Sequence, residues 1–237
     1  MERVFDDAKA MGEALRERFE AQAKEAIAAR GRYVVALTGG SAAGTLYPAL
    51  VSARVEWTKV HVFFGDERLV PATHADSNLR AASEAWLSKV SGVQVHAVKT
   101  ELGAEGAAAA MEAELAPLLP LDAVHLGMGP DGHVASLFPG HALLKERAKK
   151  VAGLSDSPKP PPARVTLTLP VLAEARELLF LVQGAAKAEV VKAALEDPAC
   201  PLPAALAHRG ARSSVWFLDR AAAGSLSSRE RVPRRGG

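Results

Sequence analysis

The sequence predicts an α/β protein of three layers, in which helices cover both faces of a mostly parallel sheet. Short apolar runs of strand length, such as Leu178–Val182, alternate along the chain with longer segments of helical periodicity. Runs that are apolar at every position are typical of parallel strands, because helices cover both of their faces. No repeat of about 20 to 50 residues is visible, which argues against a solenoid or a propeller.

Size and composition suit one globular domain. The 237 residues are 49% hydrophobic and 24% charged, which is unlike a disordered chain. We expect a single domain over residues 1–223 and a disordered basic tail over residues 224–237. The chain has no run of about eighteen apolar residues and begins with a charged segment, so we expect no membrane contact and a cytoplasmic location.

Charge and cysteine content exclude further classes of function. The formal net charge is +2, and the last fourteen residues, with four arginines against one glutamate, carry +3 of it. The remaining body is therefore near −1 and lacks the basic surface that binds nucleic acids. Cys200 is the only cysteine, so the chain has no internal disulfide and no cysteine-rich metal site.

The N-terminal elements follow from periodicity. Apolar residues recur every three or four positions over residues 4–30, as in an amphipathic helix packed on a sheet. Gly31 ends this predicted helix, and Tyr33–Leu37 is the first buried strand.

A glycine-rich turn comes next, over residues 38–45, and leads into a helix that reaches about residue 51. The backbone N–H groups of Gly39, Gly40 and Ser41, with the positive end of the helix dipole, predict an anion site that suits a phosphate. Thr45 stands where a nucleotide P-loop has its lysine, which excludes a P-loop. The alternative is an ordinary strand-to-helix turn without a ligand.

The second strand, Val60–Phe64, ends at Asp66 and Arg68. The planar guanidinium of Arg68 suits a phosphate or a carboxylate, although residues 66–68 are equally consistent with a solvated charge cluster. The polar residues at 76–78 have the chemistry of an N-cap for a helix that runs to about residue 87, and Asn78 is a candidate for orienting a catalytic loop.

The central motif joins a buried strand, Ala123–Leu126, to a glycine-rich turn that carries Asp131 and His133. Ligands of open α/β sheets usually bind at the carboxyl ends of the strands. A histidine titrates near neutral pH, and a carboxylate two residues away can set its tautomer. These residues therefore predict a general base at His133.

Two alternatives compete with this interpretation. Gly127, Gly129 and Gly132 have the spacing of a dinucleotide-binding fingerprint, but Pro130 and Pro139 leave little room for the helix that such a fingerprint requires. The other alternative is that the histidine is an ordinary loop residue.

The second half of the chain continues the alternation. Further strands are predicted at residues 93–96, 151–154, 164–169, 178–182 and 213–218, and helices at residues 104–119 and 184–195. The polar residues 141–150 are a candidate cover for the site, and residues 158–162 form a rigid proline-rich segment. Arg164 begins a strand and is well placed to meet an anion, and Lys187 opposes the dipole of its helix, which indicates recruitment for anion binding.

Four motifs together resemble the 6-phosphogluconolactonases. Residues 127–139 (Gly-Met-Gly-Pro-Asp-Gly-His-Val-Ala-Ser-Leu-Phe-Pro) look like the signature of that family. Residues 64–68 (Phe-Gly-Asp-Glu-Arg) followed by residues 74–78 (His-Ala-Asp-Ser-Asn) look like a second motif of that family. The other two are Thr-Gly-Gly-Ser at residues 38–41 and Pro-Lys-Pro-Pro-Pro-Ala-Arg-Val-Thr-Leu-Thr at residues 158–168.

The resemblance implies the modified Rossmann-like fold of the sugar-phosphate deaminases and isomerases. It implies hydrolysis of 6-phospho-D-glucono-1,5-lactone, a step of the oxidative pentose phosphate pathway. An ester is an easy bond to hydrolyse, so we expect neither a cofactor nor a metal. The catalytic residues would be His133 and Asp131, and the substrate would be bound by Gly39, Gly40, Ser41, Asp66, Arg68, Arg164 and Lys187. We expect a monomer or a small homo-oligomer whose partner is the small-molecule substrate, with neither nucleic acid nor membrane.

Two other functions remain open at this point. A phosphorylated-sugar deaminase or isomerase would share the glycine loop and the Asp-Gly-His core. A non-catalytic sugar-phosphate sensor would bind the ligand without turnover, although the sequence has no DNA-binding helix pair or separate effector domain.

Overall fold

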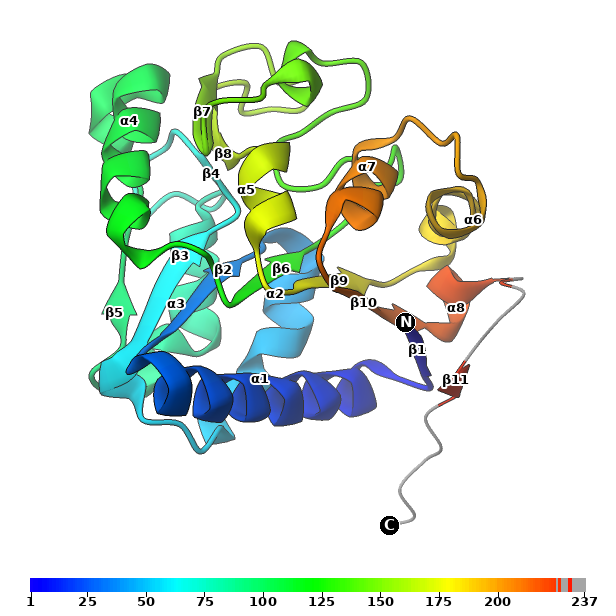
Figure 1. Ribbon diagram of the computed structural model, residues 1–237, viewed down its shortest axis with the longest axis horizontal. Helices are drawn as coiled ribbons and strands as arrows, with labels where there is room; N and C mark the ends of the chain where they lie inside the picture. The colour runs from blue at the N-terminus through cyan, green and yellow to red at the C-terminus, as the bar shows by residue number, and fades with distance from the viewer. Residues whose placement is uncertain (225, 227–229, 232–237) are drawn as a thin grey trace.

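The computed structural model describes residues 1–224, 226, 230 and 231, and it has the predicted three-layer α/β architecture (Figure 1). In this part of the chain eight strands form one sheet, and every neighbouring pair in it is parallel. From edge to edge the strands are β11 (Glu230–Arg231), β1 (Glu2–Phe5), β10 (Ser214–Asp219), β9 (Leu178–Val182), β6 (Ala123–Leu126), β2 (Tyr33–Leu37), β3 (Val60–Phe64) and β5 (Gln94–Val95). The predicted fold class is confirmed.

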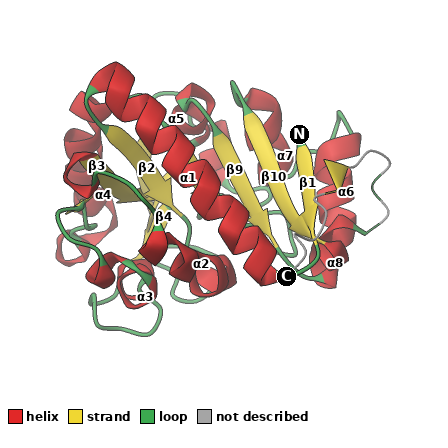
Figure 2. Ribbon diagram, turned by 90° about the horizontal axis from the view of Figure 1, so that it is seen from below, coloured by secondary structure: helices red, strands yellow, loops and turns green. Residues whose placement is uncertain are grey.

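Helices cover both faces of this sheet. On the face seen in Figure 2, the long helix α1 crosses the strands, and α2 and α3 lie beside it. The other face carries α4, α5, α6 and α7 (Figure 1). The bounds of the helices are α1 Ala8–Arg30, α2 Gly40–Leu46, α3 Asn78–Ala85, α4 Gly103–Leu115, α5 Leu169–Glu174, α6 Ala188–Glu196, α7 Pro203–Gly210 and α8 Arg220–Ala223.

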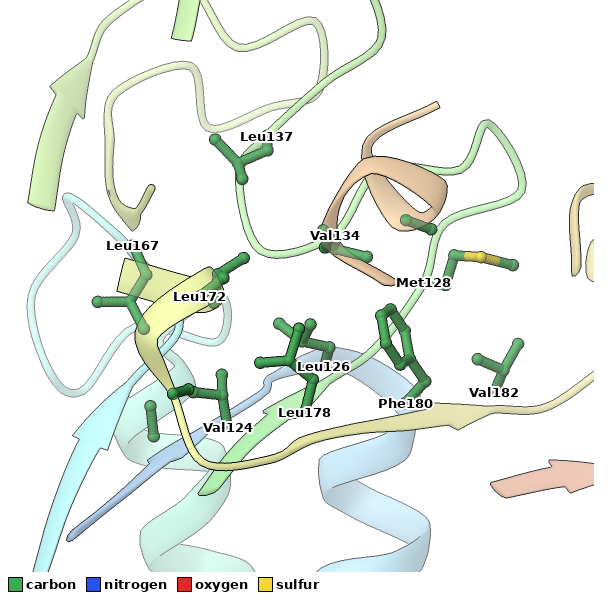
Figure 3. Close-up of a cluster of buried hydrophobic side chains, with 14 of the residues drawn as sticks. Val124, Leu126, Met128, Val134, Leu137, Leu167, Leu172, Leu178, Phe180 and Val182 are labelled. Atoms are coloured by element: carbon green, nitrogen blue, oxygen red, sulfur yellow. The ribbon is translucent and has the colours of Figure 1, made fainter. Parts of the chain in front are cut away.

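Two hydrophobic cores lie on opposite faces of the sheet because side chains alternate along each strand. In β2, Val34 and Ala36 join one core, whereas Val35 and Leu37 join the core beneath α1. Figure 3 shows the first core, in which side chains of β6 and β9 meet those of the loop after β6 and of α5. A strand buried on both faces has to be apolar throughout, which is why the sequence marked these strands clearly.

A smaller antiparallel sheet lies beside the main one. Its strands are β4 (Asp66–Arg68), β8 (Arg164–Leu167) and β7 (Val151–Leu154), in that order. The strand predicted over residues 164–169 therefore ends two residues early, because α5 begins at Leu169. This sheet places Arg68 directly opposite Arg164, a pairing that connects two of the predicted motifs.

The start of the chain differs from the prediction. Residues 2–5 were expected to belong partly to the first helix but form β1, which pairs with β10. The helix begins at Ala8 because Asp7 is its N-cap and accepts a hydrogen bond from the N–H of Ala10 at 2.8 Å. Phe5 lies in β1, although its position in the sequence matches the three- or four-residue spacing of the apolar residues in the helix. The predicted end is confirmed, since Gly31 has a left-handed φ of 75°.

The remaining local structure is short. The helices α5 and α7 were not predicted, and several connections are 3₁₀ turns: Tyr47–Ser52, Trp57–Lys59, Leu87–Lys89, Thr100–Leu102, Ala116–Leu118, Ala142–Lys145 and Ala185–Lys187. Most of the tail predicted over residues 224–237 lies outside the described residues, and Glu230–Arg231 pairs with β1. Across the described residues, every helix is too short or too polar to cross a membrane.

Candidate active site

The candidate site lies where the order of the strands reverses. After β2 the chain moves outward to β3 and β5, and it then returns to β6 on the other side of β2. The loops that follow β2 and β6 leave the same edge of the sheet in opposite directions, which opens a crevice for a ligand. The N–H of Gly127 donates to the hydroxyl of Thr38 at 2.9 Å and joins the two loops at the base of this crevice.

The crevice brings the predicted residues together. One pocket is lined by eight of the nine residues that the sequence nominated: Gly39, Gly40, Ser41, Asp66, Arg68, His133, Arg164 and Lys187. The ninth, Asp131, contacts His133. These residues come from the ends of β2, β3, β6 and β9 and from the small sheet, so the fold gathers motifs that lie up to 148 residues apart (Gly39 to Lys187).

Asp131 and His133 form a hydrogen-bonded pair. The distance from His133 Nδ1 to Asp131 Oδ1 is 2.5 Å, and the imidazole is 19% exposed. An ionised carboxylate only accepts hydrogen bonds, so Nδ1 carries the hydrogen and Nε2 is left as the basic nitrogen. Gly129 allows this arrangement, since a β-carbon at that position would overlap both the imidazole and the carboxylate.

Burial and neighbouring charges set the protonation states of Asp131 and His133. Burial lowers the pKa of His133 below its ordinary value, the contact with Asp131 raises it, and Lys159 lowers it further. Burial raises the pKa of Asp131, but its hydrogen bonds with His133 and Lys159 outweigh burial and hold that pKa below its usual range. At neutral pH the carboxylate is therefore charged and the imidazole neutral, as general-base catalysis requires.

The dinucleotide alternative is wrong for this loop. After Gly132 the chain forms a tight turn with an isolated bridge between Val134 and Leu137, and the next helical residues are those of the 3₁₀ turn Ala142–Lys145. No helix therefore starts at the third glycine to receive a pyrophosphate.

Asp66 is part of the floor of the pocket. It is 7% exposed, accepts a hydrogen bond from the Ser136 hydroxyl at 2.6 Å, and accepts another from the Asn78 amide at 3.2 Å. Its neighbour Glu67 is 3% exposed and accepts the N–H groups of Asn78 and Leu79, both at 2.8 Å, at the start of α3. The alternative of a solvated charge cluster is wrong for these two carboxylates, which organise the helix and the loop around the site.

The two arginines of the small sheet differ in their free donors. Arg164 is 3% exposed and all its nitrogens face protein acceptors: Nε the carbonyl of Pro161 at 3.0 Å, Nη1 the Ser136 hydroxyl at 3.3 Å, and Nη2 the carbonyls of Lys159 and Pro160 at 3.0 and 3.2 Å. These contacts indicate that Arg164 holds the backbone of residues 159–161 in place.

Arg68 makes fewer hydrogen bonds to the protein than Arg164 does. Its Nη1 donates to the carbonyl of Asp76 at 2.8 Å, while its Nε is buried and has no hydrogen-bond partner among the described residues. A buried donor without a partner costs free energy unless a ligand or water satisfies it. Because fewer of its donors are engaged with the protein, Arg68 is the better candidate of the two arginines to bind an anion.

Lys187 and the loop after β2 also line the pocket. Lys187 precedes α6, and burial lowers the pKa of its ammonium group, while Asp219 raises it and Lys159 lowers it. Gly39 is the N-cap of α2, Gly40 has a left-handed φ of 67°, and Ser41 is exposed in the first turn. A β-carbon on Gly39 would overlap the side chain of Asn78, so this turn needs glycine for packing.

Sequence reasoning missed three contributors to the site. Thr38 and Ser136 are buried hydroxyl residues that tie loops together, and Lys159 contacts the Asp131–His133 pair. The sequence predicts a rigid proline-rich segment around Lys159, but only the fold shows that this segment passes beside the Asp131–His133 pair.

Comparisons with known proteins agree with this geometry. A family model described as "Glucosamine-6-phosphate isomerases/6-phosphogluconolactonase" matches residues 6–216. The human 6-phosphogluconolactonase is 42% identical over 244 residues, which cover 94% of this chain and 93% of the human protein. A "Probable 6-phosphogluconolactonase 3, chloroplastic" from Oryza sativa subsp. japonica is 40% identical over 95% of this chain and 76% of its own. The solved structure of 6-phosphogluconolactonase from Trypanosoma brucei has a TM-score of 0.84 at 30% identity and covers 96% of this chain and 98% of its own.

Proposed function

The chain belongs to the glucosamine-6-phosphate isomerase/6-phosphogluconolactonase family, and we propose that it hydrolyses 6-phospho-D-glucono-1,5-lactone to 6-phospho-D-gluconate. It is an enzyme of the 6-phosphogluconolactonase kind, because relatives with that name share 40% or more of its residues over most of their length. We propose that this reaction serves the oxidative pentose phosphate pathway.

The observation that carries the proposal is that His133, paired with Asp131, lines the same pocket as the cations Arg68 and Lys187. The pair supplies a neutral imidazole with a free Nε2, and the pocket supplies the two cations. A substrate with a phosphate at one end and a reactive carbonyl at the other matches this arrangement of charge and base.

The reaction needs one proton carrier. His133 Nε2 takes a proton from a water molecule while the water oxygen forms a bond to the lactone carbonyl carbon. The tetrahedral intermediate then expels the ring oxygen, and the imidazolium returns the proton to that oxygen as the carbon–oxygen bond breaks. Asp131 holds the imidazole in the required tautomer and stabilises its positive charge while it carries the proton.

Phosphate binding is proposed for Arg68, Lys187 and the amides of the loop after β2. Support comes from Arg68, which lines the pocket and makes one side-chain hydrogen bond to the described residues, from the partly buried ammonium of Lys187, and from the first turn of α2, whose residues line the same pocket. We assign Asp66 and Arg164 the role of holding this pocket in shape, since their polar atoms are engaged with the protein.

The direct test measures the loss of freshly generated 6-phosphogluconolactone against its spontaneous hydrolysis, with EDTA present. Wild type should accelerate the loss, and His133→Ala should lower turnover by about a hundredfold or more if the histidine is the base. His141→Ala is the matched control, because His141 also pairs with a carboxylate, Asp156 at 3.0 Å, but does not line the pocket. Wild-type turnover in a folded His133→Ala protein would refute the proposed base.

Two further measurements, ammonia release and ligand binding, separate the other functions. Release of ammonia from glucosamine-6-phosphate, with no acceleration of lactone hydrolysis, would favour a deaminase. Ligand binding without turnover of either compound would favour a sensor.

Compartment and assembly remain expectations. We propose a cytoplasmic enzyme that is a monomer or a small homo-oligomer. The name of the rice relative includes "chloroplastic", so membership of the family does not by itself determine the compartment. Size-exclusion chromatography with light scattering measures the assembly.

A further inference from the structure

Lys159 reaches the Asp131–His133 pair from a distant part of the chain. Its Nζ lies 3.2 Å from Asp131 Oδ2 and 3.2 Å from His133 Nδ1. The lysine side chain is 39% exposed, so the contact sits at the rim of the pair and not within the core. The cation comes from the proline-rich segment over residues 158–162, which was predicted to be rigid.

The two contacts of the ammonium group are chemically different. His133 Nδ1 carries a hydrogen that it donates to Asp131 Oδ1, so it cannot also accept a hydrogen bond from Lys159. The hydrogen bond of Lys159 therefore goes to Asp131 Oδ2, and its proximity to the imidazole is an interaction of charge. Both carboxylate oxygens of Asp131 are then engaged: Oδ1 accepts from the imidazole and, at 3.4 Å, from the backbone N–H of His133, and Oδ2 accepts from Lys159, which fixes the rotation of the carboxylate.

The charges around His133 oppose one another. Asp131 from its own loop and Asp66 from β4 favour the imidazolium, and Lys159 disfavours it. Arg68, Arg164 and Lys187 line the same pocket and add positive charge farther from the ring. Lys159 is the cation in contact with the imidazole, so among the cations of the pocket its removal should change this balance the most.

The segment that carries Lys159 is held in place. Arg164 donates to the carbonyls of Lys159, Pro160 and Pro161 at 3.0, 3.2 and 3.0 Å, respectively. The hydroxyl of Ser157 accepts the N–H of Lys159 at 3.2 Å and donates to its carbonyl at 2.9 Å. A cation on a fixed backbone loses less conformational freedom when it contacts the pair.

We propose that Lys159 is a positioning residue for the general base, because it clamps the Asp131 carboxylate and places a positive charge beside the imidazole of His133. In this role it orients the ring through Asp131 and keeps His133 neutral in the free enzyme. The proposal rests on the proposed function only in taking His133 as the base, and its main test does not require activity.

That test is an NMR titration of the His133 Cε1–H signal in the protein without substrate, with His133→Ala to assign the signal. Lys159→Met should move the titration midpoint of His133 to higher pH, and Lys159→Arg should move it back toward wild type. Lys149→Met is the matched control, since it also removes a lysine from an ion pair, with Glu105, but Lys149 contacts neither member of the catalytic pair. Lys159→Gln is the second neutral variant if the methionine protein does not fold.

Kinetics provide the second readout. In Lys159→Met the acid limb of kcat/KM should move to higher pH, so that activity at pH 6 falls by about threefold more than activity at pH 8. A His133 midpoint equal to wild type in a folded neutral variant would overturn the proposal. A raised KM with an unchanged midpoint would also overturn it and would make Lys159 a substrate ligand.

The two hypotheses fail separately. If wild type does not hydrolyse the lactone but the His133 midpoint still depends on Lys159, the proposed function is refuted and the positioning role stands. If wild type is an active lactonase and the midpoint is independent of Lys159, the positioning role is refuted and the function stands.

Discussion

Acid should destabilise this protein through His125, a core residue of β6. The side chain is 0% exposed, and neither ring nitrogen has a hydrogen-bond partner within the described part of the chain. Its ring centroid lies 6.3 Å from that of Phe19 and 5.8 Å from that of Tyr47. Burial lowers the pKa of His125 from 6.5 to about 3, and the positive charge of Arg18 contributes to the same shift.

The sign of the effect follows from proton linkage. Between pH 6.5 and about 3 the unfolded chain binds a proton at this position and the folded chain does not, so stability falls as the pH falls. The stability that depends on a neutral His125 is fully present above pH 6.5 and is lost progressively as the pH falls toward 3. With these two pKa values, the unfolding free energy falls by about 2 kcal/mol between pH 7 and pH 5.

The perturbation is His125→Leu, with His125→Phe as a second variant. Leucine removes both unpaired nitrogens at similar volume, and phenylalanine keeps an aromatic ring but adds volume that can strain the core. The absolute stabilities of the variants therefore depend on packing, but the pH dependence does not. Both variants should lose about 2 kcal/mol less than wild type between pH 7 and pH 5.

The assay is urea denaturation at pH 5, 6 and 7, followed by tryptophan fluorescence. Trp57 and Trp86 pack against Phe19, so they report on this core. His61, His133 and His208 also have lowered pKa values and contribute acid sensitivity, which the subtraction of variant from wild type removes. Equal losses of stability in wild type and His125→Leu would refute the reasoning, because they would mean that this imidazole finds a partner or protonates in the folded state.

Outcomes are expected for four further substitutions. Gly129→Ala should lower turnover by about a hundredfold, because its β-carbon would displace the Asp131–His133 pair, and a lactonase assay with near-normal turnover would contradict that packing. Lys187→Met should raise KM more than it lowers kcat, as expected for a phosphate ligand, and an unchanged KM in steady-state kinetics would remove it from the phosphate site. Arg164→Met should lower the unfolding free energy by about 3 kcal/mol in urea denaturation, because it leaves carbonyls of the proline-rich segment unpaired. Arg68→Met should mainly raise KM. A raised KM in Arg164→Met with a loss of stability in Arg68→Met would show that Arg164 is the anion ligand.

Local sequence information was sufficient for the buried strands, because a strand covered on both faces is apolar at every position. It was also sufficient for the glycine turns and for the nomination of Asp131 and His133, which lie two residues apart in one loop. It failed at residues 2–5, where the short strand β1 shared its apolar spacing with the helix that follows, and it missed the short helices α5 and α7.

Only the tertiary structure decided which charged residues work together. The carboxylates of Asp66 and Glu67 have the composition of a surface cluster, but the antiparallel sheet and α3 bury them. The different engagement of Arg68 and Arg164 depends on carbonyls and hydroxyls from other segments, which no local pattern encodes. Lys159 meets Asp131 across 28 positions of sequence for the same reason. Periodicity and turn chemistry are properties of neighbouring residues, whereas a pKa, a paired donor or a shared pocket depends on residues that meet only when the chain is folded.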